Sequence, residues 1–191
     1  NTPVLEDAAE SLGSAYKGVQ TGNFGDIGVF SFNGNKIITT SGGGMAIVPD
    51  AEAKSKFVFW ATQARERNLW YQHEEIGYNY RLSNICAGIG RGQLKAINER
   101  IKRKTEIYNL YKECFKNNRY ITLIPEPENS KPNHWLTVAL LSSDCKANFI
   151  DIIKVLAENN IESRSAWKPM HLQPVYNNCD FISAKNEFSV C

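Results

Sequence analysis

The sequence predicts an α/β protein with a buried, mostly parallel sheet first and a smaller α/β domain second. Three observations lead to this prediction. Residues 1–50 alternate short apolar runs with glycine-rich turns, as strands covered on both faces do. Apolar residues then recur at helical spacing between residues 53 and 115. A polar segment with prolines at 124–130 marks a domain edge, and a strand, a helix and a strand are expected after it.

Three apolar runs are expected to form the strands of the first sheet. Residues 4–5 end the first run and deliver Asp7, and the other two runs cover 27–32 and 45–48. Ligands of open α/β sheets bind beyond the carboxyl ends of the strands. The polar residues that follow these runs are therefore expected at one ligand-binding edge.

Helices are expected in the middle of the chain. One is predicted at 53–67, and Ser83 is expected to cap a second one that begins at Asn84. A longer helix is predicted at 94–115, where apolar residues line one face.

The smaller domain is expected to follow the long helix. A strand is predicted at 134–141, a helix at 149–156 and another strand at 161–164. The expected domains are therefore 1–118 and 119–191.

Charge, cysteines and hydropathy exclude several classes of protein. The net charge is +2 and basic residues mingle with acidic ones, so no nucleic-acid surface is expected. The 5 cysteines lack the close pairing of a zinc or redox motif, which favours reduced thiols in a cytoplasmic protein and no metal site. No apolar run has the length of about 18 residues that a membrane span needs, so no membrane partner is expected.

Lys36 carries the strongest chemical signal. Most lysines are solvated surface groups, but Lys36 follows an apolar strand and precedes Ile37 and Ile38. Dry surroundings favour a neutral amine, and the neutral amine attacks aldehydes. The Ser31 hydroxyl and the backbone amides of glycines 42–44 could hold a phosphate beside it. The same glycines could equally form a tight turn without a ligand.

Asp7 supplies a second group. Pyridoxal phosphate chemistry needs a lysine for the cofactor aldehyde and an acid that keeps the pyridine nitrogen protonated. Asp7 precedes Lys36 by one strand-and-loop unit. An aspartate at this place could also cap a short helix at 8–11, and its position alone leaves both interpretations open. The joint spacing of Asp7 and Lys36 favours the cofactor.

Five segments resemble the DegT/DnrJ/EryC1/StrS family of sugar aminotransferases. They lie at 6–11, 25–32, 33–36, 77–84 and 168–174, in the family's order and approximate spacing, and the resemblance covers essentially the whole chain. It implies pyridoxal 5′-phosphate as cofactor and the aspartate aminotransferase type of fold. The expected fold is partial, with the second half of the large mixed-sheet domain and most of the small C-terminal α/β domain.

The resemblance implies a role for each matching residue. Lys36 matches the lysine that forms the Schiff base, and Asp7 matches the acid that pairs with the pyridinium nitrogen. Glu10 stands where the family has glutamine, histidine or glutamate near the phenolic side of the cofactor ring. Ser31 matches a serine that binds the cofactor phosphate. Asn79 matches an asparagine that reaches this phosphate from the partner subunit of a homodimer.

The resemblance also implies a reaction. The family moves an amino group from glutamate to the 4-keto group of a nucleotide-linked deoxysugar in bacterial polysaccharide biosynthesis, and His171 resembles a residue near the sugar or nucleotide. Lys36 favours transamination, because family members that act as sugar 3-dehydratases have histidine there. The sequence is most similar to enzymes that act on UDP-linked 4-keto-6-deoxy-N-acetylhexosamines. GDP-perosamine synthases are the alternative.

The two ends of the chain predict a piece of a larger protein. Asn1 opens the sequence in place of methionine, and Cys191 ends it inside an apolar stretch. The family's N-terminal portion, with the aromatic residue that stacks on the cofactor, is expected to be missing, as is the last part of the small domain. The alternative to an enzyme is therefore a noncatalytic fragment or assembly subunit.

Overall fold

The computed structural model describes residues 2–180, which form two compact units. The first unit comprises the described residues up to Tyr108 together with Glu126–Leu136. The second comprises Asn109–Pro125 and the described residues from Thr137 onward. The last part of the predicted second domain, residues 181–191, lies outside the described residues.

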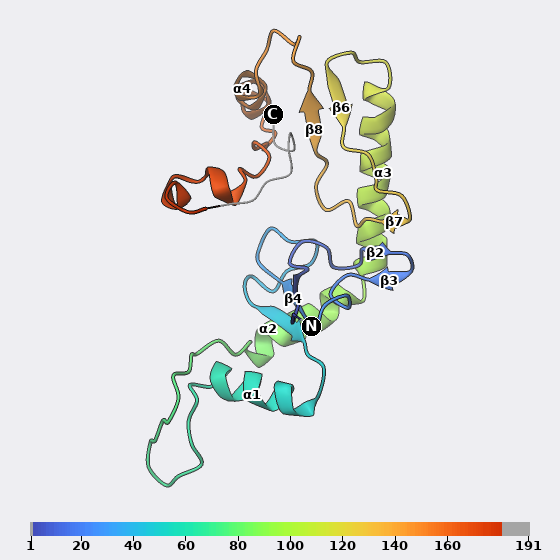
Figure 1. Ribbon diagram of the computed structural model, residues 1–191. Coiled ribbons are helices and arrows are strands. Elements are labelled where there is room, and N and C mark those ends of the chain that lie inside the picture. The colour runs from blue at the N-terminus through green and yellow to red at the C-terminus, as the bar shows by residue number, and fades with distance from the viewer. Residues whose placement is uncertain (1, 181–191) are drawn as a thin grey trace. The chain divides into compact units, whose positions relative to one another are not determined.

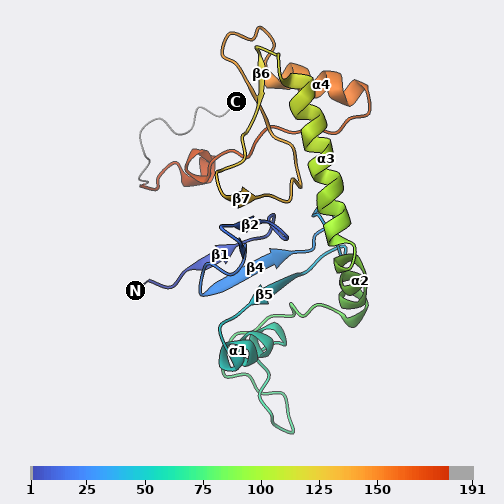
Figure 2. The same ribbon diagram turned by 90° about the vertical axis from the view of Figure 1, so that its right-hand side faces the viewer.

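The main sheet of the first unit contains β1 (Leu5–Asp7), β4 (Ile27–Ser31) and β5 (Gly44–Ile47), in the order β1-β4-β5 (Figure 2). β1 and β4 are parallel, whereas β4 and β5 are antiparallel. The expectation of a mostly parallel sheet is wrong for the second pairing, because β5 follows β4 without the crossover helix that usually joins parallel strands. The carboxyl ends of β1 and β4 and the start of β5 consequently lie at one edge.

A second small sheet brings a distant segment back to the first unit. β2 (Ala15–Tyr16) pairs antiparallel with β3 (Val19–Gln20) and with β7 (Ser130–Lys131) (Figure 1). The backbone N–H of Lys17 also donates to the carbonyl of Asn129 at 2.9 Å. These bonds place the residues after β7 beside the turns that follow β1.

A small apolar core supports the main sheet. Its buried members are Ala8, Phe30, Phe32 and Ile38, with Leu12 and Ile97 packed against them. Close backbone contact adds to this packing at Gly28 in β4, where a Cβ atom would lie 2.1 Å from the carbonyl oxygen of Gly22. A side chain at residue 28 would therefore push two backbone segments apart.

Three helices follow the main sheet in sequence. They are α1 (Ala51–Ala61), α2 (Asn84–Leu94) and α3 (Ile97–Phe115). The predicted cap of α2 is confirmed, since the Ser83 hydroxyl oxygen accepts a hydrogen bond from the N–H of Cys86 at 3.2 Å. This bond satisfies one of the N–H groups that a helix start leaves without a partner.

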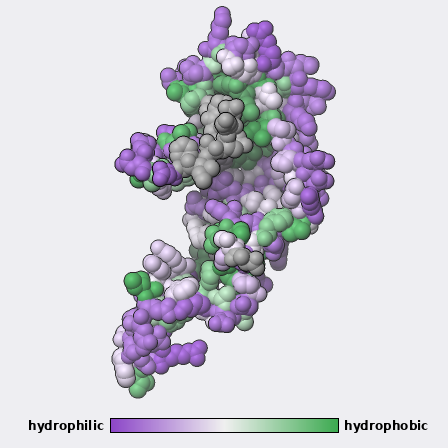
Figure 3. All heavy atoms as spheres, in the orientation of Figure 1, coloured by the Kyte–Doolittle hydropathy of each residue, from purple (hydrophilic) through white to green (hydrophobic). Residues whose placement is uncertain are grey.

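Helix α1 is shorter than the helix predicted at 53–67. Gln63 and Ala64 have φ angles of 71° and 48°, and this left-handed backbone ends the helix. The loop that follows carries exposed apolar side chains, among them Leu69, Trp70, Tyr71 and Ile76. Figure 3 shows one face of the molecule, where hydrophilic residues predominate and hydrophobic residues form separate patches between them.

The second unit contains an antiparallel pair of strands and a helix. The strands are β6 (Ile121–Leu123) and β8 (Ala139–Leu141), and the helix is α4 (Phe149–Glu158). Two short 3-10 helices, η1 (Met170–Leu172) and η2 (Pro174–Tyr176), come after it. Among residues 2–180, no helix is long and apolar enough to span a membrane.

Two strands predicted for the second domain are corrected by the structure. Residues 161–164 form no strand, because the N–H of Ile161 bonds back to the carbonyl of Leu156 at 2.9 Å and closes the end of α4. The strand predicted at 134–141 is confined to Ala139–Leu141. Its first residues are buried in the first unit instead.

Candidate active site

Asp7 is the last residue of β1 and begins a turn. Its Oδ1 atom accepts a hydrogen bond from the N–H of Ala9 at 3.0 Å, and the residues that follow form turns rather than the short helix considered as an alternative. Within residues 2–180, its other carboxylate oxygen makes no hydrogen bond, and the side chain is exposed. One oxygen of Asp7 is thus available to a ligand at the sheet edge.

Ser31 ends the neighbouring strand β4 at the same edge. Its hydroxyl oxygen accepts a hydrogen bond from the N–H of Asn33 at 3.3 Å. Its hydroxyl hydrogen is not used among the described residues, which leaves a donor for an anion. The backbone of Ser31 pairs with Gly44, so the glycine turn at 42–44 returns to this edge.

Lys36 and Glu10 meet beyond the strand ends. Lys36 lies in the loop after β4, and its Nζ atom is 2.9 Å from Oε1 of Glu10, which lies in the turn after β1. The Lys36 side chain is 12% exposed and that of Glu10 44% exposed. The pair therefore places a largely buried amine beside a partly solvated carboxylate.

Trp135 covers the same lysine and was missed by the sequence analysis. The Lys36 Nζ atom lies 4.7 Å from the centroid of the Trp135 ring, within the range of a cation–π interaction. The indole N–H donates to the carbonyl of Asn35 at 2.7 Å, and the residue is only 9% exposed. Trp135 thus contacts both the lysine side chain and the loop that carries it.

Asn133 connects Trp135 to the turn that contains Glu10. Its Nδ2 atom donates to the carbonyls of Glu10 at 3.0 Å and Leu12 at 3.1 Å. Its Oδ1 atom accepts from the N–H of Trp135 at 3.0 Å. One signal could have revealed this loop, because the polar run from Pro132 to His134 interrupts the strand pattern with turn-forming residues.

Glu6 stabilises the loop that precedes β4. Burial raises the pKa of its carboxyl, but hydrogen bonds from the N–H groups of Gly22, Phe24 and Gly25 outweigh that effect and hold the pKa below its ordinary value. The two shorter bonds measure 2.6 Å from Gly22 and 2.8 Å from Phe24. Glu6 is therefore a structural anion next to Asp7.

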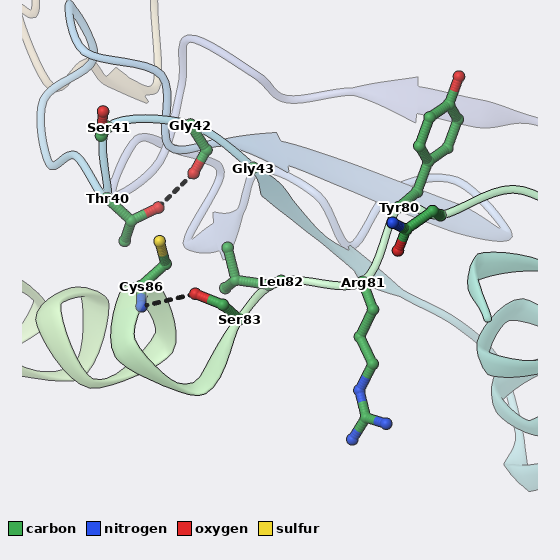
Figure 4. A pocket seen from close by; sticks show the side chains of 10 residues that line it. Thr40, Ser41, Gly42, Gly43, Tyr80, Arg81, Leu82, Ser83 and Cys86 are labelled. Carbon is green, nitrogen blue, oxygen red and sulfur yellow. Dashed lines mark hydrogen bonds between the residues drawn. The ribbon is translucent and has the colours of Figure 1, made fainter.

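Asn79 lies at a shallow pocket beside the glycine turn. The pocket encloses about 610 Å³ and is lined by Thr40–Gly43, Asn79–Ser83 and Cys86 (Figure 4). Asn79 is exposed, and its backbone forms an isolated bridge with Thr62. The pocket thus connects Asn79 with the loop after β4, while no hydrogen bond joins Asn79 to Ser31 among the described residues.

His171 is the one candidate residue that lies outside the first unit. It belongs to η1 in the second unit and is partly buried. The five other candidate residues all belong to the first unit. Among residues 2–180, no group of three or more His, Cys, Asp or Glu side chains could hold a metal ion.

Comparison with known proteins identifies the family. The model of the DegT/DnrJ/EryC1/StrS aminotransferase family matches residues 1–189. The chain belongs to this family. The resemblance expected from the five sequence segments is thereby confirmed, and pyridoxal phosphate is the cofactor of DegT/DnrJ/EryC1/StrS aminotransferases.

Two family members show how much of a relative the chain matches. It is 49% identical over 189 residues to EpsN of Bacillus subtilis (strain 168), which is named as a pyridoxal phosphate-dependent aminotransferase, and the match covers 99% of this chain and 48% of EpsN. It is 38% identical over 177 residues to GDP-perosamine synthase of Escherichia coli O157:H7, covering 93% of this chain and 48% of that protein. The chain spans about half the length of these relatives.

A solved structure of the family has the same fold. The sugar aminotransferase Spr1654 from Streptococcus pneumoniae, in its PLP form, matches with a TM-score of 0.83 and 26% identity. The match covers 94% of this chain and 47% of that one. The expected partial fold of a DegT/DnrJ/EryC1/StrS aminotransferase is therefore confirmed.

Proposed function

We propose that the protein containing this chain is an aminotransferase that moves an amino group from glutamate to the 4-keto group of a nucleotide-linked deoxysugar, in bacterial polysaccharide biosynthesis. The observation that carries the proposal is the Lys36 side chain, which is 12% exposed and lies beyond the strand edge where Asp7 and Ser31 end β1 and β4. A buried lysine at a ligand-binding edge is unusual unless its amine has a chemical role.

The donor set at this edge fits pyridoxal phosphate. A carboxylate with an unused oxygen, at Asp7, suits a pyridinium N–H. A hydroxyl with an unused hydrogen, at Ser31, and the backbone N–H groups of glycines 42–44 suit a phosphate. When bound, the cofactor supplies an aldehyde for amines and a ring that takes up the electron pair left by proton loss.

Each residue has a distinct part in the proposed reaction. Lys36 would supply the amine that holds the cofactor and, once the amino donor has taken its place, would move the proton at the substrate carbon. Asp7 keeps the ring nitrogen protonated by accepting its hydrogen bond. Glu10 holds the Lys36 amine at this edge and, as the family match implies, would lie near the phenolic side of the cofactor ring. Ser31 holds the phosphate.

Two roles require more than the first unit. We assign Asn79 to the cofactor phosphate of a partner subunit, since its exposed side chain makes no hydrogen bond among the described residues. The protein is then a homodimer with shared active sites. We assign His171 to the sugar or nucleotide, because its loop matches the family segment with that role.

A UDP-linked 4-keto-6-deoxy-N-acetylhexosamine is the preferred substrate of the proposal. The segments at 31–36 and 168–174 support it, because they are most similar to enzymes that use such sugars. A GDP-linked 4-keto-6-deoxysugar is the second candidate. The 38% identity to GDP-perosamine synthase supports that alternative.

The test is amination of a panel of nucleotide sugars by the protein expressed from its complete reading frame. The UDP-linked and GDP-linked 4-keto-6-deoxy sugars are supplied with glutamate and pyridoxal phosphate, and the amino sugar is measured by mass spectrometry. We expect yellow protein that glutamate decolours, and faster amination of the UDP sugars. Faster amination of the GDP sugar would select the alternative substrate. Protein that binds no cofactor and aminates no sugar would overturn the enzyme proposal and favour an assembly subunit.

A further inference from the structure

The strongest unassigned feature is the buried segment 133–135, which packs on Lys36. Its three residues are among the most buried of the chain, with exposed fractions of 5% for Asn133, 8% for His134 and 9% for Trp135. Two of them are polar, and buried polar groups are retained only where partners compensate their desolvation. The segment is therefore fixed by specific contacts.

His134 fixes the backbone of this segment. Its Nε2 atom lies 2.7 Å from Oε1 of Glu126, and its ring stacks on Tyr108 with centroids 4.2 Å apart. Its φ angle of 47° lies in the left-handed region that residues with a side chain rarely adopt. This turn directs the next residue, Trp135, toward the loop that carries Lys36.

Trp135 and Asn133 hold the two sides of the Lys36–Glu10 pair. The indole N–H bonds to the carbonyl next to Lys36, and the Asn133 amide bonds to the carbonyl of Glu10 itself. In addition, the face of the indole ring covers the Lys36 amine. Displacing the indole would free both the lysine side chain and its loop.

We propose that Trp135 is a positioning residue for Lys36, with its ring face holding the amine beside Glu10 and its N–H holding the loop at Asn35. The consequence for catalysis rests on the proposed function, but the positioning itself does not. Trp135 would act through Lys36 and leave substrate binding unchanged. Loss of its aromatic face should then lower kcat and leave KM for glutamate unchanged.

The first experiment measures the chemical reactivity of the Lys36 amine and needs no catalytic turnover. The protein from the complete reading frame is first freed of bound cofactor, because a cofactor held on the Lys36 amine would block the reagent. It is then treated with acetic anhydride, and the acetylation rate of Lys36 is followed by peptide mass spectrometry. We expect Trp135→Leu to raise this rate about tenfold, because the variant removes the cover and the cation–π contact. Trp135→Phe keeps an aromatic face and should stay within about threefold of the wild type.

Trp70→Leu is the matched control, because Trp70 is an exposed tryptophan of the same unit whose N–H bonds to Gln72. It should leave the Lys36 rate unchanged. Thermal unfolding checks that each variant folds. Should Trp135→Leu not fold, Trp135→Met, which fills similar space without an aromatic face, takes its place. The proposal is overturned if Lys36 in a folded non-aromatic variant is acetylated at a rate within twofold of the wild type.

The second experiment connects positioning to catalysis. We expect kcat to fall about tenfold in Trp135→Leu with KM for glutamate within twofold, and Trp135→Phe to recover most of kcat. A rise in KM with unchanged kcat would show that Trp135 binds substrate and would overturn the positioning role. An inactive wild-type protein with the expected acetylation pattern would overturn the proposed function and leave the positioning of Lys36 standing.

Discussion

The Nζ atom of Lys36 lies 2.9 Å from Oε1 of Glu10, and this ion pair joins the loop after β4 to the turn after β1. The two residues are 26 positions apart in the sequence. Their contact brings the amine of the proposed reaction to the edge where two parallel strands end.

Replacing Lys36 by alanine should abolish transamination in the complete protein. The loss should be roughly 10⁴-fold in kcat, because no other group can bond to the aldehyde and move the proton. Steady-state amination of the nucleotide sugar with glutamate measures it. Lys36→Arg keeps the positive charge as a control and should be equally inactive. Ping-pong turnover retained in Lys36→Ala would contradict the role assigned to this lysine.

Glu10 variants should separate hydrogen bonding from charge. Glutamine can still accept the hydrogen bond from Lys36, so Glu10→Gln should keep kcat within about tenfold of the wild type. Glu10→Leu removes the acceptor and should lower kcat further. Lys36 acetylation and amination kinetics are measured on both variants. Equal activity of the two variants would show that Lys36 does not depend on this acceptor.

Glu6 should make stability depend on pH in the acid range. Its pKa is below the ordinary value of 4.5 in the folded chain, so its stabilising effect is complete well above pH 4.5 and is lost as the pH falls through the lower folded value. Thermal unfolding between pH 7 and pH 3 measures this change. Glu6→Gln should be less stable at pH 7 and lose less stability on acidification. Parallel curves for the two proteins would refute the prediction.

Two glycine substitutions should have opposite effects on stability. Gly28→Ala should lower the free energy of unfolding by about 1–3 kcal/mol, because the new Cβ would meet the Gly22 carbonyl. Gly88→Ala in α2 has no atom within 4 Å of its new Cβ and should raise it by about 0.5–1 kcal/mol. Chemical denaturation of both variants tests the contrast. An unchanged free energy of unfolding in Gly28→Ala would mean that the two backbone segments can separate.

His134 variants should distinguish the backbone conformation from the side-chain contacts. His134→Ala loses the Glu126 contact, the Tyr108 stack and a residue type that tolerates left-handed φ, and should cost about 2–4 kcal/mol of stability. His134→Asn tolerates the backbone better and should recover part of this loss. Equal destabilisation by both variants would assign the whole effect to the side-chain contacts.

Local signals predicted much of the fold. The hydroxyl of Ser83 and the apolar run after it were enough to locate the start of α2, because helix capping depends on neighbouring residues only. The strands that end at Asp7 and Ser31 were predicted for a similar reason, since apolar runs and glycine turns mark them, but their predicted ends at residues 5 and 32 differ from the observed ones. The antiparallel direction of β5 was not predicted, because strand pairing is decided by the connection and the tertiary packing.

The candidate site was predictable only in part. Lys36 and Asp7 stand out by residue type and spacing, whereas the contact of Lys36 with Trp135 is set by tertiary structure. The sequence around Trp135 alternates like a strand, and the left-handed turn at His134 that breaks it depends on a stack with Tyr108 in α3. A pattern within a short window cannot show such a contact.

The hydrogen bond from Trp135 to Asn35 closes a loop of 100 residues. Contacts of such high sequence separation form late in folding, because loop closure costs entropy before any other contact compensates it. During synthesis, a nascent chain that has not yet reached residue 135 cannot have Lys36 covered by Trp135. The surroundings of the reactive amine are therefore completed by the last segment of the first unit to be synthesised, after both α3 and β7.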